Sequence, residues 1–198
     1  FVLPIACWHG YRGETDAEGT SLETLTWAAG LLAATKTIVA FGTVHVPLIN
    51  PIFAAKQCVT ADRIGQGRFG LNIVSGWNAG EFEMFGVELL EHDERYVYSE
   101  EWSAIVKRVW SETEPFDFKG KYFDLKGILI KPKPQGGGRP LFLSAGSSRA
   151  GRAFDQQGNN FWRLSCRTEL VVCQIRVRHL AIDLLHFFQQ READTLED

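Results

Sequence analysis

Short apolar runs alternate with longer amphipathic segments along most of the chain. The apolar runs cover residues 1–6, 37–46, 68–74 and 140–145. Between them, residues 22–33, 52–64 and 95–110 repeat apolar side chains at intervals of three and four. That spacing is the period of one helix face, whereas short apolar runs rich in β-branched residues are typical of buried strands. We therefore predict strands for the first set and helices for the second.

Capping and turn residues sharpen the predicted boundaries. Thr20 or Ser21 can cap the first helix, and Pro51 stands where the first turn of the second helix should begin. Gly65 and Gly67 are expected to end that second helix.

The second half of the chain adds shorter elements. Residues 116–130 predict a β-hairpin that turns at 119–121, because a Lys-Gly-Lys sequence separates two apolar stretches. Residues 75–94 are predicted to form a long loop. A short helix is expected over 146–157, and one more strand is expected to begin within 159–162.

This order of elements predicts an α/β fold with a parallel sheet covered by helices. Both a doubly wound sheet and an arc of a (β/α)₈ barrel satisfy it. No Gly-x-Gly-x-x-Gly sequence follows the first strand, which weakens the dinucleotide-binding alternative.

The third predicted strand carries the clearest indication of a binding site. Asn72 interrupts an otherwise apolar run, and a buried amide needs a hydrogen-bond partner. Gly76 and Gly80 follow, where the strand should lead into a helix. Ligands of parallel α/β proteins bind at this carboxyl end of the strands. We therefore expect this segment to form part of a cofactor pocket.

Bulk properties exclude several classes of protein. The net charge is −3 and 45% of residues are hydrophobic, so we expect neither nucleic-acid nor anionic-membrane binding. No signal peptide is evident and no apolar run is long enough to span a bilayer. The four cysteines lack close pairs, so we expect reduced thiols in a cytoplasmic protein and no metal site; they are Cys7, Cys58, Cys166 and Cys173.

Several motifs in order along the chain resemble one known family. Residues 72–81 read Asn-Ile-Val-Ser-Gly-Trp-Asn-Ala-Gly-Glu, and residues 60–69 before them read Thr-Ala-Asp-Arg-Ile-Gly-Gln-Gly-Arg-Phe. Together with residues 94–96, 117–123 and 144–148, they resemble the bacterial luciferase-like flavin monooxygenases. The branch with alkanesulfonate, dimethylsulfone and pyrimidine monooxygenases is the most similar, and the resemblance extends from residue 1 to about 162.

The resemblance implies a TIM-barrel oxidoreductase that uses reduced FMN and O₂ to oxygenate a small organosulfur or heterocyclic substrate. A separate NAD(P)H:flavin reductase would supply the reduced FMN, and a homo-oligomer is expected. By the motif match, Asn72 and Glu81 would contact FMN, Arg95 and Tyr96 would lie near its phosphate, and Ser147 and Ser148 would form the phosphate-binding turn.

Each of these residue types also has an ordinary structural role. Ser147 and Ser148 follow Gly146 and would bind an anion at a helix N-terminus, but they could simply cap that helix. Asn72 could satisfy neighbouring backbone groups, Glu81 could cap the next turn, Arg95 could be solvated, and Tyr96 could pack in the core.

His45 is the candidate catalytic residue, because it lies beside the break at Pro47, where a strand should end at the catalytic face of a barrel. It could donate a proton or contact the substrate, and a structural His bonded to a loop carbonyl is an equal alternative. Trp8 and Trp77 could wall an apolar cavity, with Cys7 and His9 beside them, whereas Trp27 and Trp102 are expected to pack helices.

The chain also departs from the family pattern. A complete barrel takes about 250 residues, and only strands 2 to 6 have candidates here. We expect an incomplete barrel domain over 1–162 and a helical tail over 163–198 that resembles nothing in the family. An inactive remnant that binds flavin or a partner chain is therefore one alternative function. A deazaflavin-dependent oxidoreductase on the same barrel is a lower-ranked one.

Overall fold

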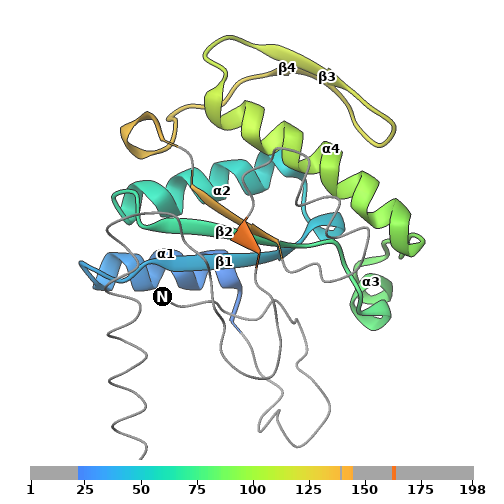
Figure 1. Ribbon diagram of the computed structural model, residues 1–198, viewed down its shortest axis with the longest axis horizontal. Coiled ribbons are helices and arrows are strands. Elements are labelled where there is room, and N and C mark those ends of the chain that lie inside the picture. The colour runs from blue at the N-terminus through green and yellow to red at the C-terminus, as the bar shows by residue number, and fades with distance from the viewer. Residues whose placement is uncertain (1–21, 139, 145–161, 164–198) are drawn as a thin grey trace, which may run out of the picture.

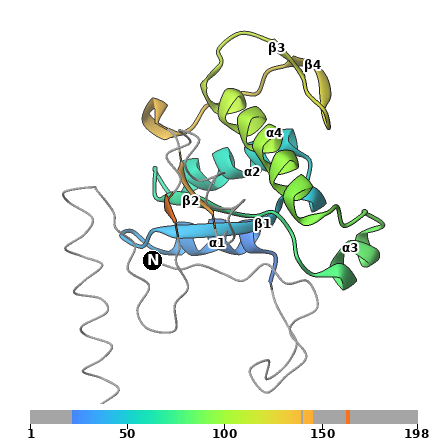
Figure 2. The same ribbon diagram turned by 45° about the vertical axis from the view of Figure 1, so that its right-hand side comes forward.

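The computed structural model describes residues 22–138, 140–144 and 162–163, and its centre is a parallel sheet (Figures 1 and 2). Four strands form this sheet in the order β1-β2-β5-β6. They are β1 (Ala40–His45), β2 (Phe69–Val74), β5 (Leu141–Ser144) and β6 (Trp162–Arg163). Each neighbouring pair is parallel. The predicted parallel sheet is therefore confirmed, and all its carboxyl ends lie at one edge.

Three helices cover one face of the sheet. They are α1 (Thr24–Ala34), α2 (Pro51–Ile64) and α4 (His92–Ser111). Helix α1 packs on β1, and α2 lies between α1 and α4, as both views show (Figures 1 and 2). One large core joins these helices to the sheet, and its largest fully buried side chains include Trp102, Phe69 and Leu32.

Alternation along the strands separates the two faces of the sheet. In β2, the side chains of Phe69, Leu71 and Ile73 belong to the core beneath the helices, so the residues between them face the other way. In β1, a Cβ on Gly42 would lie 2.2 Å from the Leu25 side chain of α1, so Gly42 also faces the helices. We call the opposite side, which Phe41 and Leu143 share, the inner face.

Caps explain where the first two helices begin. The expected caps Thr20 and Ser21 were wrong, because α1 starts after Glu23, whose carboxylate accepts from the backbone N–H groups of Leu25 and Thr26. A carboxylate at this position satisfies two amides that have no partner within the helix. Pro51 does occupy the first turn of α2, where the preceding Asn50 side chain caps the helix.

The predicted loop over 75–94 was wrong in part. It contains α3 (Ala79–Phe85), and α4 already begins at His92. Helix α3 ends at Gly86, whose φ of 66° places it in the left-handed region that favours glycine. A helix of 7 residues shows too few apolar repeats for its period to be recognised in a sequence.

The predicted hairpin is confirmed. Strands β3 (Phe116–Lys119) and β4 (Asp124–Ile128) pair antiparallel, separate from the main sheet. They lie beyond α4, on its side away from the sheet (Figures 1 and 2). Two single 3₁₀ turns complete the described elements, η1 (Val46–Leu48) and η2 (Gln135–Gly137).

Other predicted elements fall outside the described residues, namely the strand over 1–6, the helix over 146–157 and the tail after 163. The last predicted strand corresponds to β6. Within the described ranges, no helix is both long and apolar enough to cross a membrane.

Candidate functional site

The inner face of the sheet changes from apolar to polar along the strands. Its amino-terminal half is tightly packed, since a Cβ on Gly70 would lie 2.3 Å from the Phe41 ring. Leu143 of β5 joins Phe41 in this apolar part. Toward the carboxyl edge the same face carries Thr43, Asn72 and then His45, all buried. A row of polar side chains therefore begins where ligands of parallel sheets bind.

Thr43 and Asn72 form the first polar pair. They are register partners on neighbouring strands, and the Asn72 amide Nδ2 donates to Thr43 Oγ1 over 3.2 Å. Asn72 is only 3% exposed. Its amide oxygen, Oδ1, has no hydrogen-bond partner within the part of the chain that the structure describes. A buried carbonyl without a donor costs free energy, so this oxygen is available to a bound group.

His45 and Glu81 form the second polar pair, one step closer to the carboxyl edge. His45 ends β1, and Glu81 comes from α3, which lies beyond the ends of β1 and β2 (Figures 1 and 2). His45 Nδ1 and Glu81 Oε2 are 2.8 Å apart, with both side chains almost completely buried.

Burial decides the protonation state of His45. It lowers the pKa of His45 from its ordinary value, because the charged imidazolium loses solvation, while the nearby Glu81 carboxylate opposes this effect. The net direction favours a neutral imidazole at neutral pH. A neutral ring has one nitrogen that donates and one that accepts, which suits it to proton transfer.

The turn after β2 places Glu81. Gly76 has a φ of 101°, and a Cβ there would lie 2.4 Å from the ring of Phe82. The turn therefore requires glycine on two counts, backbone conformation and space. Phe82 is buried by this close approach, and its neighbour Glu81 is 0% exposed.

Arg95, near the start of α4, binds the turn that follows β2. Its guanidinium donates to the carbonyl oxygen of Gly76. The Ser99 hydroxyl donates to the Arg95 carbonyl over 2.8 Å and lies 3.0 Å from the Ser75 hydroxyl. Arg95 Nε is buried and has no acceptor among the described residues. A guanidinium N–H of this kind is a donor for an anionic oxygen.

The remaining predicted site residues are placed as follows. Tyr96 is half-buried and packs against the main core, with its ring 5.3 Å from that of His92 between centroids. Trp77 is 50% exposed. Trp102 packs helices as predicted, and its indole N–H donates to the Ile49 carbonyl over 2.9 Å. Ser147 and Ser148 lie outside the described residues, as do Cys7, Trp8 and His9.

Two participants escaped prediction from the sequence, Thr43 and the Gly76 carbonyl. Thr43 lies two residues before His45, so a strand places both on one face, and this spacing could have indicated it. The carbonyl of Gly76 gave no comparable indication, because any residue has a carbonyl.

Among the described residues, no group of three or more His, Cys, Asp or Glu side chains could hold a metal ion. Cys58 is a free, buried thiol in α2, and burial raises its pKa far above the ordinary value. Such a thiol stays protonated and unreactive.

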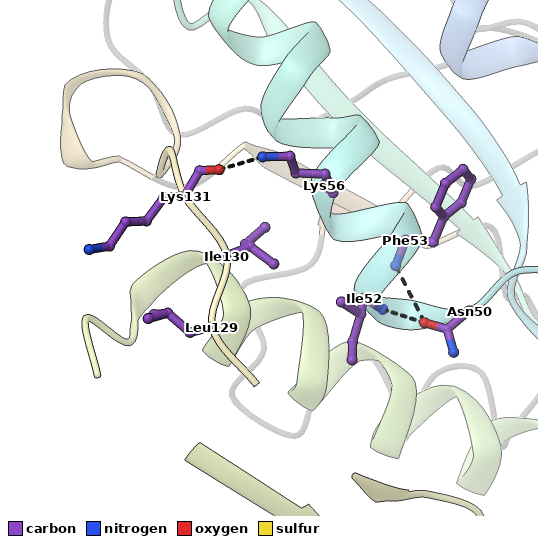
Figure 3. Close-up of a pocket in the computed structure, with 7 residues that line it drawn as sticks. All are labelled: Asn50, Ile52, Phe53, Lys56, Leu129, Ile130 and Lys131. Carbon is purple, nitrogen blue, oxygen red and sulfur yellow. Dashed lines mark hydrogen bonds between the residues drawn. The ribbon is translucent and has the colours of Figure 1, made fainter. Parts of the chain in front are cut away.

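One hollow among the described residues lies between the start of α2 and residues 129–131, away from the inner face (Figure 3). It measures about 560 Å³ and is lined mainly by apolar side chains from the start of α2 and from residues 129–131. Its Lys56 amine already donates to the Lys131 carbonyl. None of the predicted site residues lines it.

Known proteins match most of the chain. The luciferase-like monooxygenase family matches residues 5–156. The chain belongs to this family. The resemblance noted from the sequence motifs is thereby confirmed.

Named relatives include two of the three kinds of enzyme in the branch that the motifs resemble. The chain is 37% identical over 161 residues to a pyrimidine monooxygenase of Pseudomonas syringae pv. syringae, covering 79% of this chain and 43% of the relative. It is 41% identical over 130 residues to an FMNH(2)-dependent dimethylsulfone monooxygenase of Pseudomonas fluorescens, covering 66% of this chain and 35% of that relative. The chain thus spans less than half the length of these relatives.

A solved structure supports the fold. The EDTA monooxygenase of Chelativorans sp. BNC1 superposes with a TM-score of 0.71 at 22% identity, covering 77% of this chain and 40% of that one. At this identity the likeness concerns the fold alone.

Proposed function

We propose that the chain is part of an FMN-dependent monooxygenase that uses reduced flavin and O₂ to oxygenate a small organosulfur or heterocyclic compound. One observation carries the proposal. This chain belongs to the luciferase-like family, and its fold places four polar side chains at the carboxyl edge of the sheet: Asn72, His45, Glu81 and Arg95. Two buried polar atoms there, Asn72 Oδ1 and Arg95 Nε, have no hydrogen-bond partner among the described residues.

The residues present fit FMN at both of its ends. Asn72 and Glu81 would hold the ring system, since an amide and a carboxylate can accept from ring N–H or ribityl hydroxyl groups. Arg95 would donate to the phosphate, with Tyr96, Ser147 and Ser148 beside it. When bound, reduced FMN supplies the electrons that let O₂ transfer one oxygen atom to the substrate.

His45 is proposed as the catalytic residue. Its buried, neutral ring can accept a proton at one nitrogen and hold one at the other, close to the Glu81 carboxylate. The apolar packing of Phe41 and Leu143 closes the inner face behind the polar row. That packing would help exclude water from the reacting groups.

The substrate class and partners follow from the relatives. One relative is named for a pyrimidine substrate, and the other is named as an FMNH(2)-dependent dimethylsulfone monooxygenase. For this chain we propose a separate NAD(P)H:flavin reductase as the partner, a homo-oligomer and a cytoplasmic location.

A non-catalytic flavin-binding remnant of the family is the alternative proposal. The chain spans 43% of the pyrimidine monooxygenase. We further propose that residues 1–162 form the family domain and that 163–198 are a helical addition to it.

Flavin titration tests the binding step. FMN should bind the chain with saturation and more tightly than riboflavin, which lacks the phosphate. Arg95→Gln should reduce this preference about tenfold, since a charge-assisted hydrogen bond contributes roughly 1.5–3 kcal/mol. Arg63→Gln on α2 is the matched control, because its guanidinium contacts the Lys133 carbonyl instead. A folded chain that does not bind FMN would refute the proposal.

Formation of oxygenated product distinguishes an active monooxygenase from a non-catalytic remnant. Chemically reduced FMN is added under air with dimethylsulfone or uracil, and the products are identified by mass spectrometry. Oxygenated product that is lost in His45→Gln supports the enzyme. FMN binding without any oxygenated product from either substrate supports the remnant.

A further inference from the structure

We infer that residues 180–198 of this chain bind the hollow between the start of α2 and residues 129–131. The apolar part of this segment would cover the apolar side chains of the hollow, and its acidic part would meet the lysines beside them. The contact is separate from the proposed FMN site, because none of the predicted site residues lines the hollow.

The hollow presents apolar side chains to solvent (Figure 3). Ile52 and Phe53 come from α2, and Leu129 and Ile130 follow β4. Phe53 is 60% exposed, and the other three are half-buried. A group of exposed apolar side chains favours contact with another apolar surface.

Cations stand beside these apolar side chains. Lys56 and Lys131 are the charged residues that line the hollow. Arg63 comes two turns after Lys56 on the same side of α2. Residues 129–138 contain no Asp or Glu. The hollow therefore suits a segment that is apolar in one part and acidic in another.

Residues 180–198 have this composition. Residues 180–188 read Leu-Ala-Ile-Asp-Leu-Leu-His-Phe-Phe. Residues 189–198 follow with four acidic side chains and one basic side chain, a net charge of −3. Complementary charge favours such a segment at the lysine side of the hollow.

Charge also distinguishes the hollow from a second group of exposed apolar side chains, around α3. Trp77, Met84 and Phe85 are each exposed by 40% or more. Residues 79–94, however, contain six Asp or Glu and no Lys or Arg. An acidic segment would be repelled from that surface.

The path of the chain allows the contact. Strand β6 ends at Arg163, and α2 begins shortly after the end of β1, so both points lie at the carboxyl edge of the sheet. Four neighbouring strands span about 15 Å. Residues 164–179 could bridge about 50 Å if extended. Their length is therefore sufficient to reach the hollow.

Zero-length cross-linking with a carbodiimide tests the contact in the full chain. This reagent joins an amine to a carboxylate where the two groups touch. Cross-links should join Lys56 or Lys131 to acidic residues within 189–198, as identified by mass spectrometry of the peptides. The Lys121–Glu94 pair is the internal control, with 2.6 Å between amine and carboxylate. If the control forms and the other cross-links do not, the inference is wrong.

A mixture of isotope-labelled and unlabelled chains identifies which copy supplies the segment. Contact within one chain should cross-link only peptides that carry the same label. Cross-links between differently labelled peptides would place a second copy in the hollow and would overturn the inference.

Phe53→Ser tests the apolar part of the contact. Phe53 is mostly exposed, so the substitution should leave the core intact, as circular dichroism can check. Amide hydrogen exchange of residues 180–188 should become about tenfold faster, as expected when a large apolar side chain loses its contact. Met84→Ser, at a position of α3 that is 56% exposed, is the matched control and should leave that exchange unchanged.

Equal exchange of residues 180–188 in the wild type and in Phe53→Ser would also overturn the inference. None of these measurements involves FMN, so a negative result would leave the proposed function as it stands.

Discussion

At the scale of single residues, Gly76 shows how backbone geometry serves the site. Its carbonyl accepts from Arg95, and its missing side chain leaves room for Phe82, next to Glu81. The residue thus links the predicted phosphate side of the site to the His45–Glu81 pair. Replacing Gly76 should therefore lower the free energy of unfolding, whether or not a ligand is bound.

We predict that Gly76→Ala lowers the free energy of unfolding by about 2 kcal/mol or more. A φ of 101° strains any residue with a Cβ, and the added methyl group would lie 2.4 Å from the Phe82 ring. Urea unfolding measures the change. Gly30→Ala is the control, since Gly30 in α1 has nothing within 4 Å of an added Cβ. It should stabilise the chain by roughly 0.5–1 kcal/mol, and equal effects of the two variants would contradict the explanation.

At the scale of elements, α4 connects the sheet edge to the hairpin. Its amino-terminal Arg95 reaches the turn after β2, and further along the helix Glu101 holds the turn between β3 and β4. The Glu101 carboxylate accepts from the backbone N–H groups of Lys121 and Tyr122 over 2.6 and 2.9 Å. The hairpin is thus attached to α4 by its backbone as well as by side-chain packing.

We predict that Glu101→Ala releases the hairpin turn without unfolding the sheet. The amides of Lys121 and Tyr122 lose their acceptor, so their hydrogen exchange should become about tenfold faster, as expected for a local loss of roughly 1.4 kcal/mol. Amides of β1 and β2 should exchange as before. Glu83→Ala, at an exposed position of α3, is the control and should leave the turn protected. Unchanged exchange at Lys121 would show that the Glu101 carboxylate does not hold the turn.

The elements also show where prediction from sequence stops. Helix α2 followed from Pro51 and its apolar spacing, and β2 followed from an apolar run, because both signals are local. Helix α3 was missed, since its conformation depends on the tight turn at Gly76 and on burial of Phe82 against it. The cap of α1 was misplaced because several polar residues precede that helix, and only the backbone path selects Glu23.

At the scale of the whole molecule, folding buries a histidine that the unfolded chain leaves in water. Burial lowers the pKa of His45 in the folded state below the ordinary value of about 6.5, with Glu81 as the charged group against it. The unfolded state therefore binds the proton more readily. This contribution to stability is complete above about pH 6.5 and decreases as the pH falls below that value.

We predict that the free energy of unfolding of the wild type falls from about pH 7 to about pH 5, and that His45→Gln shows a smaller fall. Urea unfolding across this range provides the measurement. His92→Gln is the control, because His92 is exposed in the first turn of α4. A variant curve parallel to that of the wild type would contradict the assigned role of burial at His45.

The sequence by itself determined the alternation of strands and helices, the hairpin, the family and the residue types at the site. These depend on local propensity and on motifs that are continuous in the chain. Only the tertiary structure decided which side chains meet. Thr43 lies opposite Asn72, 29 positions away, because β1 and β2 pair in one particular register. Glu81 reaches His45 because the Gly76 turn directs α3 across the sheet edge. Register and turn direction depend on packing between distant segments, so no local pattern could specify them.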